Sequence, residues 1–594
     1  MRLNRSIFNG SWRRALLQLG LAAPLSLAIS GCDLTATDQP QTRQEATRFL
    51  NQASFGPSEA DIATLTDLGY TQWINNQLAT ASDISFQDYY ETRRTELGRA
   101  PNVDQIYEAF YTRALVGKAQ LRNRVLLALS EIFVVSILDP GILQAPELMA
   151  GYLDVLDKGI DSTYRDLLER ISKNPAMGRY LTFLSNAKEN PIVGNTPDEN
   201  YAREVMQLFS VGLYQLNGDG TVKLDGNGKP IYTYGMSDVK GLAKVFTGWT
   251  RDHGTGVAST DRFKCFYVFT DCDDVIGRYR PMVNYTEYHS TGEKAFLGTT
   301  IPAQSSPDPE GDLKIALDTL ANHPNTAPFI SRQLIQKLVT SNPSPAYVQR
   351  VAARFLATGG HLGETVKAIL LDTEARDQTS ATNLTYGKLR EPVLRMTAVL
   401  RAFNFTDPAL DPSGSQRTAS GALSHVTLSM TSDASTSLGQ TPFASPSVFN
   451  FFRPGYVMPQ SSSAQSGLVA PEFQLVNEAS VTGYVNFTTQ MVTDATLSTP
   501  YFGDMLRGPA LALSELRIAA TSDTALVSLV ADRLLGGTIS AALSQSIEAV
   551  LQTMPVPASD GSAAAVAQLN TVLDQRLRAA ILLGAVSPEF LIQR

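Results

Sequence analysis

Helical spacing of apolar residues recurs along nearly the whole chain, and this pattern most limits the folds open to it. Apolar residues at positions i, i+3, i+4 and i+7 line one face of an α-helix. The spacing begins at Glu45, where the polar N-terminal stretch ends. The expected helical segments are 57–79, 103–137, 148–158, 162–171, 197–212, 237–247, 312–321, 328–340, 345–357, 362–371, 387–403, 473–493, helices within 509–552, and 563–585.

Two segments depart from the helical pattern. Residues 214–234 alternate around Gly, Asn and Asp turns, which is typical of a β-hairpin, and residues 263–300 are also β-rich. The expected fold class is therefore mainly α, a large multi-helix domain with small β-hairpin insertions and long loops. We expect the main helical domain to cover 45–480 and a C-terminal helical region, 481–594, to pack on it.

The N-terminus has the pattern of an export signal. Residues 1–14 carry four arginines and no acid, and an apolar stretch follows that is too short to span a membrane stably. It ends in Ile29-Ser30-Gly31-Cys32, which resembles a bacterial lipobox. We therefore expect a signal peptide over 1–31, a lipid anchor on Cys32 and a tether linker over 32–44. The alternative is an ordinary secreted protein with an incidental cysteine.

Two further features of this region bear on localisation. Arg13-Arg14 resembles a twin-arginine signal, which would export the protein already folded, although any signal peptide can carry two arginines. Asp33 directly follows the lipidation site and resembles a signal that retains lipoproteins in the inner membrane. The expected location is a bacterial membrane, facing the periplasm or the cell exterior, with the inner membrane favoured.

Composition and known motifs exclude several functions. The chain of 594 residues is 43% hydrophobic and 18% charged, enough to bury a large core. Its formal net charge is −8 and no basic block lies beyond the N-terminus, so nucleic acid is not an expected partner. P-loop, Gly-x-Ser-x-Gly, dinucleotide-binding and His-x-x-x-His motifs do not occur. No cofactor or metal is expected.

Cys265 and Cys272 are the cysteines that remain after the anchor. In an exported protein two nearby cysteines favour a disulfide. The alternative is a metal site that adds His253 and Asp271 or Asp273, but it lacks the four well-spaced thiol or imidazole ligands of zinc sites.

The stretch TPDENYAREVMQLF at 196–209 predicts a helix with one polar side. Thr196 suits the N-cap, Pro197 the first helical position, and Glu199 completes a capping box. The polar arc holds two amides and an arginine beside its acids: Glu199, Asn200, Arg203, Glu204 and Gln207. It is either the solvated face of an amphipathic helix or the wall of a site.

Glu131 is the single charge in VLLALSEIFVVSI, residues 125–137. A helix that is apolar nearly all round buries this carboxyl, so it must be paired or protonated. Arg124 and Arg122 are local candidate partners and Arg203 is a distant one. Glu131 is either part of a structural ion pair or an acid of raised pKa beside a cleft.

Two of the five histidines lie in polar surroundings. His289 is close to Glu287 and Glu293, and His323 comes just before an expected helix. Each is more often a hydrogen-bonding loop residue than a catalytic base.

Taken together, several phrases of the sequence resemble the bacterial family known as domain of unknown function 1800. They cover nearly everything after the linker: ATRFLNQASFGP at 46–57, LRNRVLLALSEIFVVS at 121–136, NPAMGRYL at 174–181, PDENYAREVMQLFSVGLYQL at 197–216, LAKVFTGW at 242–249, HPNTAPFISRQLIQKLVTSNPSP at 323–345, LREPVLR at 389–395, PSVFNFFRPGY at 446–456 and SPEF at 587–590.

This resemblance implies a large, exported, mostly helical protein. It implies no activity, but genes of the family commonly lie beside those of domain of unknown function 1501, whose fold is similar to the alkaline phosphatase and sulfatase group. The family pattern marks Asn200, Ala202, Arg203, Glu204, the pair Gly248-Trp249 and a histidine at position 289. This chain departs from relatives at Gln207 and Ser290, where they often carry acids, and this weakens a metal site.

Two functions follow as hypotheses. The favoured one is a membrane-tethered binding or assembly component that acts with a protein of the 1501 family. The alternative is an exported hydrolase with Glu204 and Glu131 as acid and base, Arg203 as an orienting group and His289 completing the pocket. Four further residues are candidates for binding: Asn200, Glu199, Gln207 and His323. The enzyme hypothesis requires Glu131, Arg203, Glu204 and His289 to meet in one cavity.

Overall fold

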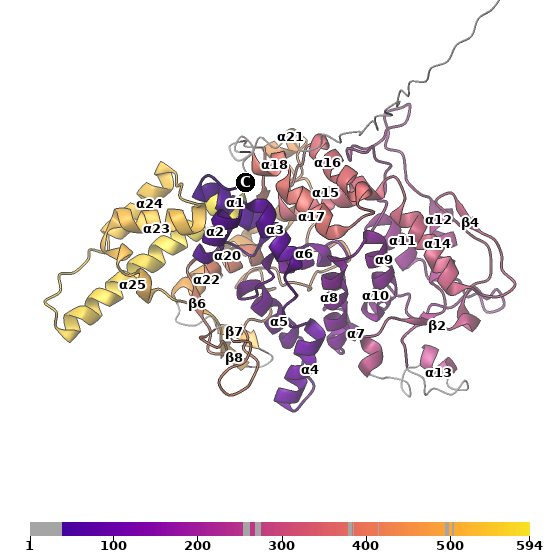
Figure 1. Ribbon diagram of the computed structural model, residues 1–594, viewed down its shortest axis with the longest axis horizontal. Helices are drawn as coiled ribbons and strands as arrows, with labels where there is room; N and C mark the ends of the chain where they lie inside the picture. The colour runs from indigo at the N-terminus through magenta and orange to yellow at the C-terminus, as the bar shows by residue number, and fades with distance from the viewer. Residues whose placement is uncertain are drawn as a thin grey trace, which may run out of the picture. The chain divides into compact units, whose positions relative to one another are not determined.

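The computed structural model describes residues 38–253, 262–267, 275–377, 383, 385–413, 415–493, 498–501 and 504–594. Thr37–Arg594 forms one compact unit by its internal contacts. Helices dominate this unit and the strands are short, which confirms the expected mainly α class (Figure 1).

The first helices of the chain surround a buried centre. They are α1 Arg43–Ala53, α2 Glu59–Leu68, α3 Tyr70–Ala79, α4 Phe86–Leu97, α5 Asp104–Leu115, α6 Gln120–Ser130, α7 Pro140–Leu143, α8 Glu147–Gly159, α9 Tyr164–Ser172 and α10 Pro175–Tyr180.

Short strands and 3-10 helices (η) occur mainly in the middle of the chain. The elements there are α11 Asn200–Gln207, α12 Met236–Ala243, η1 Lys244–Phe246, β1 Trp249–Thr250, α13 Arg262–Tyr267, η3 Val275–Arg278, β2 Val283–Asn284, η4 Thr286–Tyr288, β3 Lys294–Phe296, β4 Thr299–Ile301, α14 Pro309–Ala321, α15 Thr326–Leu338, α16 Pro345–Ala357, α17 Leu362–Leu371 and α18 Thr373–Arg376.

Long loops precede a last group of helices. The elements are β5 Lys388–Leu389, α20 Pro392–Ala402, β6 Phe405–Thr406, α21 Ser462–Gln465, η5 Pro471–Leu475, α22 Glu478–Thr493, β7 Ser498–Tyr501, β8 Asp504–Arg507, β9 Ala510–Leu511, η6 Ser514–Leu516, η7 Ala519–Thr521, α23 Asp523–Leu535, α24 Ala541–Gln552, α25 Ala563–Ala585, α26 Pro588–Leu591 and β10 Ile592–Gln593.

The core forms around α6 and α20. Every residue of both helices is buried. Helices α3, α5, α8 and α15 pack on α6, while α5 and α23 pack on α20. Because both helices are covered on all sides, their polar side chains are buried as well, among them Arg124 on α6 and Arg401 on α20. Residues from distant parts of the chain therefore meet here.

The strands pair two by two in antiparallel fashion. The pairs are β1 with β2, β3 with β4, β5 with β10, β6 with β9, and β7 with β8. In the first pair Trp249 lies opposite Asn284. The β5–β10 pair joins the chain before α20 to the chain after α26, and α26 contacts α23. Figure 1 shows the end of the chain beside α1.

The predicted hairpin over 214–234 is confirmed. Tyr214 bridges Tyr232, and a second turn is closed by the bridge between Leu216 and Val222. The expected β-rich segment 263–300 is correct only in part, because α13 and two 3-10 helices lie within it and residues 268–274 are outside the described part.

The start of α11 differs from the prediction. Its first residue is Asn200 and its N-cap is Glu199, so Thr196 and Pro197 do not open it. The Asn186 amide oxygen accepts from the Asp198 backbone N–H at 2.9 Å, and the Asp198 carboxylate accepts from that of Asn200 at 2.8 Å. These contacts hold the preceding residues outside the helix, which the local capping pattern could not indicate.

The helix expected through 137 is also shorter. It ends at Ser130, and Glu131 is its C-cap. The following residues leave the helix and bind the loop near 443: Ile137 N–H donates to the Phe443 carbonyl at 2.8 Å, and Ser136 Oγ donates to that of Ser445 at 2.7 Å. Among the described residues, no helix has both the length and the apolar character needed to cross a bilayer.

Candidate functional site

The polar face of α11 is divided between solvent and interior. Arg203 and Glu199 form a partly exposed ion pair at 3.3 Å. Asn200 and Gln207 are half-buried, and Glu204 is buried. The predicted helix face is therefore neither fully solvated nor a fully buried wall.

Glu204 is a buried carboxyl with few donors. Its Oε2 receives no hydrogen bond within the described part of the chain. Burial raises its pKa, and the charge of Arg203 lowers it only in part. Burial also raises the pKa of the neighbouring Tyr180 and Tyr234 to about 12, with a smaller contribution from Glu204. A carboxyl in this setting can stay protonated at a pH above the range in which a carboxyl ordinarily loses its proton.

The loop that contacts the start of α11 is strained. Thr182 and Ser185 have φ angles of 61° and 63°, a left-handed conformation that is uncommon for residues other than glycine. Thr182 Oγ1 donates to the Asp198 carboxylate at 3.1 Å and accepts from the Asn200 amide at 3.4 Å. Such strain costs on the order of 1–3 kcal/mol per residue and persists only where surrounding contacts enforce it.

Glu131 is buried and paired, as predicted, but its partner is a lysine. Lys337 Nζ on α15 lies 2.9 Å from Glu131 Oε2. Arg124, which was a predicted partner, instead donates to the Lys337 carbonyl at 2.6 Å, and Arg122 binds Asp161 at 2.7 Å. Since α15 packs on α6, a tertiary contact supplies the cation that the local sequence was expected to supply.

A second carboxyl shares this environment. Burial and the charge of Glu391 raise the pKa of Glu131 to about 8. The pKa of Glu391 is instead lowered, to about 2: burial opposes this, but the neighbouring Glu131 carboxyl and the charges of Lys337 and Lys388 favour its ionised form. Gln440 donates to Glu391 at 2.7 Å. When two neighbouring carboxyls share one proton, the pKa of one is expected to rise and that of the other to fall.

This cluster joins four distant segments. Lys388, before α20, lies 2.9 Å from Glu472 in η5 and donates to two carbonyls of α15. The adjoining cavity, lined in part by Lys337 and Phe452, is about 10 Å³. A cavity of that size holds at most about one water molecule. The cluster is therefore built to connect helices, with no room for an organic substrate.

His289 lies in a fully enclosed network. Its Nδ1 is 2.8 Å from the Thr247 carbonyl oxygen, and its Nε2 is 3.0 Å from Asp312. Lys294 also contacts Asp312, at 2.8 Å. Because the histidine, the lysine and the aspartate are all buried, the network connects the strand region to α14.

His323 helps to hold the hairpin. Its Nδ1 accepts from the Asn325 backbone N–H at 3.1 Å. The Asn325 amide then donates to the carbonyls of Val211 and Tyr214 at 2.9 and 2.8 Å. Burial lowers the pKa of His323, with a smaller contribution from Lys223. These contacts give it a structural position at the base of the hairpin.

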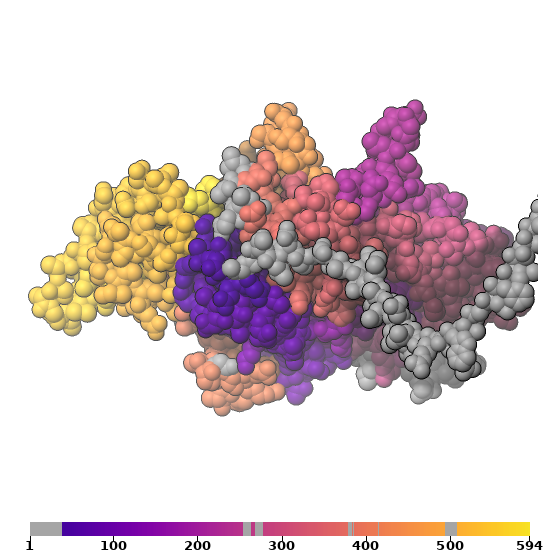
Figure 2. All heavy atoms as spheres, turned by 45° about the horizontal axis from the view of Figure 1, so that its top comes forward, coloured from indigo at the N-terminus to yellow at the C-terminus, as the bar shows by residue number. Residues whose placement is uncertain are grey.

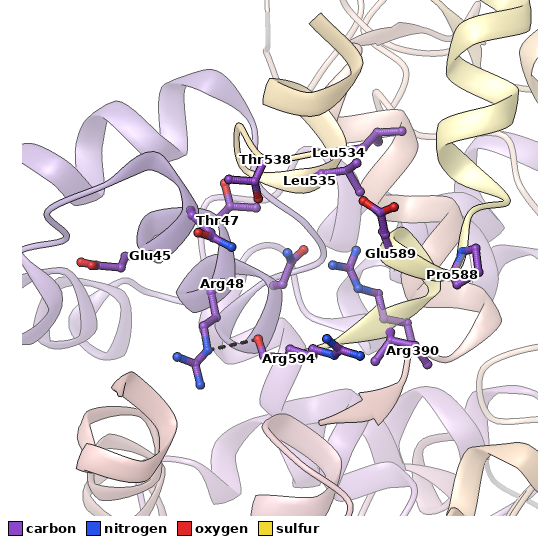
Figure 3. A pocket seen from close by; sticks show the side chains of 13 residues that line it. Glu45, Thr47, Arg48, Arg390, Leu534, Leu535, Thr538, Pro588, Glu589 and Arg594 are labelled. Atoms are coloured by element: carbon purple, nitrogen blue, oxygen red, sulfur yellow. Dashed lines mark hydrogen bonds between the residues drawn. The ribbon is translucent and has the colours of Figure 1, made fainter. Parts of the chain in front are cut away.

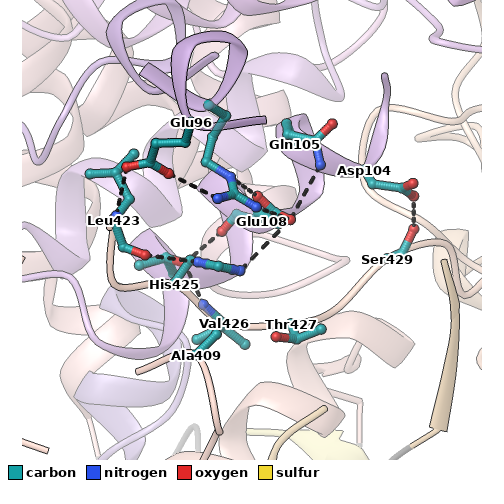
Figure 4. A network of polar contacts seen from close by, with 12 residues as sticks. Glu96, Asp104, Gln105, Glu108, Ala409, Leu423, His425, Val426, Thr427 and Ser429 are labelled. Carbon is teal, nitrogen blue, oxygen red and sulfur yellow. Dashed lines mark hydrogen bonds and ion pairs between the residues drawn. The ribbon is translucent and has the colours of Figure 1, made fainter. Parts of the chain in front are cut away.

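A fourth buried network was not predicted from the sequence (Figure 4). Glu108 on α5 accepts from Tyr89 at 2.9 Å and Arg93 at 3.0 Å, and His425 lies 3.8 Å away. Figure 4 shows how this carboxylate ties the long loop near His425 to α4 and α5. A glutamate within the helical pattern of 103–137 was the only sign of this network in the sequence. Its loop partner, His425, is too far away in sequence to be predicted.

The four candidate catalytic residues thus have different partners. Glu131 contacts Lys337, Glu204 is next to Arg203, and His289 binds Asp312. Their catalytic roles stay predictions, as do the binding roles of the other candidates. Cys32 and Cys272 lie outside the described residues, so lipidation and the disulfide with Cys265 also stay predictions.

An exposed surface adjoins the polar face of α11. We call residues 213–234 the arm, and Figure 2 shows it standing out from the neighbouring surface. Arg203 lies 4.0 Å from the Met236 sulfur, and Tyr234 donates to Gln207 at 3.4 Å, so α11 borders the base of the arm. Seven large apolar side chains here are exposed: Ile192, Val193, Leu213, Val222, Leu224, Tyr232 and Met236.

We call this region, the arm with loop 190–195, Met236 and the polar face of α11, the arm surface. Ile192 is 94% exposed and Tyr232 is 65% exposed. Large apolar side chains gathered on one part of a surface are typical of interaction sites. Among the described residues, no group of three or more His, Cys, Asp or Glu side chains is placed to hold a metal ion.

Comparison with known proteins identifies a family. Its model, described as "Protein of unknown function (DUF1800)", matches residues 48–592. No curated protein and no solved structure matches the chain. The match covers almost all of the helical unit, including α11, the arm and the buried networks. The chain therefore belongs to the DUF1800 family of proteins of unknown function, as its sequence phrases indicated.

Proposed function

We propose that this protein is a lipid-anchored, exported binding component that engages a protein partner through the arm surface. The partner proposed is the product of a neighbouring gene of the domain of unknown function 1501 family. The observation that carries the proposal is the exposure of large apolar side chains on the arm and on loop 190–195.

The composition of the arm surface supports protein binding. Burial of exposed apolar area contributes roughly 25 cal/mol per Å², so a partner that covers these side chains gains a substantial driving force. The exposed pair of Glu199 and Arg203 provides a polar border beside them. An apolar centre with a polar rim is the usual arrangement of a protein interface.

The position of the arm is fixed by the body of the protein. Asn325 at the start of α15 donates to two carbonyls at the arm's base, and to Thr233 Oγ1 at 3.3 Å. A fixed base reduces the entropy lost when the arm binds. The arm can therefore present its apolar side chains without a large rearrangement.

Partner binding is tested with the tagged full-length chain and its 1501-family neighbour. We expect Ile192→Asp and Tyr232→Asp each to weaken the complex at least tenfold, because each replaces an exposed apolar side chain of the arm surface with a charge. Ile518→Asp is the matched control, since Ile518 is 79% exposed and lies far along the chain from the arm. Equal binding by all four proteins would contradict the proposal.

The membrane anchor is tested separately. Cys32→Ser removes the thiol that would carry the lipid, so this variant should appear in the soluble fraction while the parent protein remains with membranes. Unchanged membrane association of the variant would rule out the anchor. The partner assay is unaffected by this result, because it uses purified protein.

One observation favours the second candidate function, an exported hydrolase. Glu204 combines burial, a raised pKa and an oxygen without a donor, which suits a general acid. If this function is right, the chain hydrolyses a model ester or glycan and Glu204→Gln abolishes turnover, whereas Glu293→Gln, at an exposed position, does not. Turnover that survives Glu204→Gln would exclude this role.

A further inference from the structure

A cavity lies where the two ends of the described unit meet. It is lined by α1, the end of α23, α26 and the chain around β5 and β10, and its volume is about 340 Å³ (Figure 3). Pockets that take small organic ligands begin at about 300 Å³. This cavity is therefore large enough for a small molecule, unlike the one beside Lys337.

The charged lining of this cavity, which we call the basic pocket, includes three arginines. Arg48, Arg390 and Arg594 line it together with Glu45 and Glu589 (Figure 3). The two carboxylates have donors of their own. Glu589 accepts from the backbone N–H of Ser540 at 3.1 Å and from its hydroxyl, and Glu45 accepts from the Gln41 N–H at 2.7 Å.

Arg390 is the residue that most needs a partner. It is 7% exposed, and within the described residues its guanidinium forms neither an ion pair nor a hydrogen bond. One face of the group lies over the Phe590 ring, 4.8 Å from its centre. Burial lowers its pKa to about 10, and nearby Arg395 adds to this effect. An unpaired buried cation is strongly unfavourable, and a bound anion would offset this cost.

Arg48 is held in place by the main chain. Its Nε donates to the Arg594 carbonyl at 3.1 Å, the bond drawn in Figure 3, and its Nη1 donates to that of Asp377 at 2.6 Å. These two bonds orient the guanidinium. A fixed arginine loses little entropy when a ligand binds.

We propose that the basic pocket binds a small organic anion whose carboxylate or phosphate group pairs with the Arg390 guanidinium. Arginine matches both groups through two parallel hydrogen bonds. Leu534, Leu535 and Ile592 form an apolar wall for the rest of the ligand. Arg48 and Arg594 add positive charge at the same cavity, and this site is separate from the arm surface.

The test measures binding of two probes to the full-length chain by calorimetry: citrate for carboxylates and glycerol 3-phosphate for phosphates. At least one probe should bind, with no equivalent effect of sodium chloride at the same ionic strength. Arg390→Met should weaken that binding at least tenfold, because it removes the paired group and keeps a similar apolar volume.

A second variant avoids any change to the buried arginine. Thr538 is exposed at the pocket, so Thr538→Glu adds an opposing charge without disturbing the core, and it should also weaken binding at least tenfold. Thr571→Glu, at an exposed position on α25, is the matched control and should bind as the parent does. Binding by citrate alone or by glycerol 3-phosphate alone supports the site and identifies the anionic group. No binding of either probe, or equal binding by Thr538→Glu, would overturn the proposal.

Discussion

Asp312 and Glu131 are both buried carboxyls beside a lysine, yet their pKa values are shifted in opposite directions. Asp312 accepts hydrogen bonds from His289, Lys294 and Gln304, and although burial opposes this, they hold its pKa below the ordinary value. Glu131 has one cation, Lys337, and a competing carboxyl, so its pKa rises to about 8. Burial alone therefore does not decide the charge of a carboxyl in this protein; the number of donors decides it.

Glu204 extends the comparison to a third case. It has burial and one arginine on the same helix, without the donors of Asp312 and without the second carboxyl of Glu131. Its pKa is raised above the ordinary value, as the pKa of Glu131 is. The three carboxyls form a series in which fewer donors leave the group more easily protonated.

The largest effect is expected for Asp312→Asn. The change leaves the buried Lys294 without its counter-charge, and breaking a buried ion pair costs about 3–5 kcal/mol. Urea unfolding at pH 7 measures the loss, with Glu293→Gln as the exposed control. A loss below about 1 kcal/mol would show that the network does not hold α14 in place.

The second prediction concerns the pH dependence caused by Glu131. Between the ordinary value of 4.5 and about 8, the carboxyl is protonated in the folded state and ionised in the unfolded state. The folded state then binds more protons, so stability falls as pH rises, by at most about 1.4 kcal/mol per pH unit. Glu131→Gln should remove this slope, as measured by unfolding at pH 5, 6, 7 and 8. Parallel curves for parent and variant would mean that Glu131 is ionised when folded.

The third prediction is smaller and concerns Glu204. Replacement by glutamine removes a carboxyl that has few donors, so stability at pH 6 should change by less than about 1 kcal/mol. Because the pKa of Glu204 is raised, the parent should also lose stability relative to the variant as pH increases from 5. Thermal unfolding across this range checks both effects. A large loss of stability in Glu204→Gln would mean that Glu204, like Asp312, is held by contacts that stabilise the fold.

The smallest effect is expected for Arg203→Ala. Its ion pair with Glu199 is partly exposed and lies within one helix, and such pairs contribute about 0.3–0.5 kcal/mol. Denaturant unfolding should therefore show almost no change at pH 7, and added salt should not enlarge it. A loss above about 1 kcal/mol would show that Arg203 stabilises the buried charge of Glu204.

Local sequence patterns predicted much of the fold. The helix expected over 563–585 has those bounds, and the hairpin over 214–234 forms around its Gly and Asn turns. Both depend on contacts between residues close in sequence. The capping pattern at Thr196 failed because Asn186, which lies on the preceding loop, binds the chain before α11. Where a tertiary hydrogen bond competes with a local cap, periodicity cannot tell which prevails.

The sequence by itself determined that the protein is helical, that Glu131 must be paired or protonated, and that it shares the phrases of its family. These conclusions need only periodicity, the cost of burying charge and motif spacing. Only the tertiary structure decided that Lys337 pairs with Glu131, that Asp312 binds His289, and that Arg390 lines a pocket beside α1. The reason is physical: ion pairs and cavities arise where helices distant in sequence pack together, and a carboxyl's protonation depends on the donors that packing brings to it.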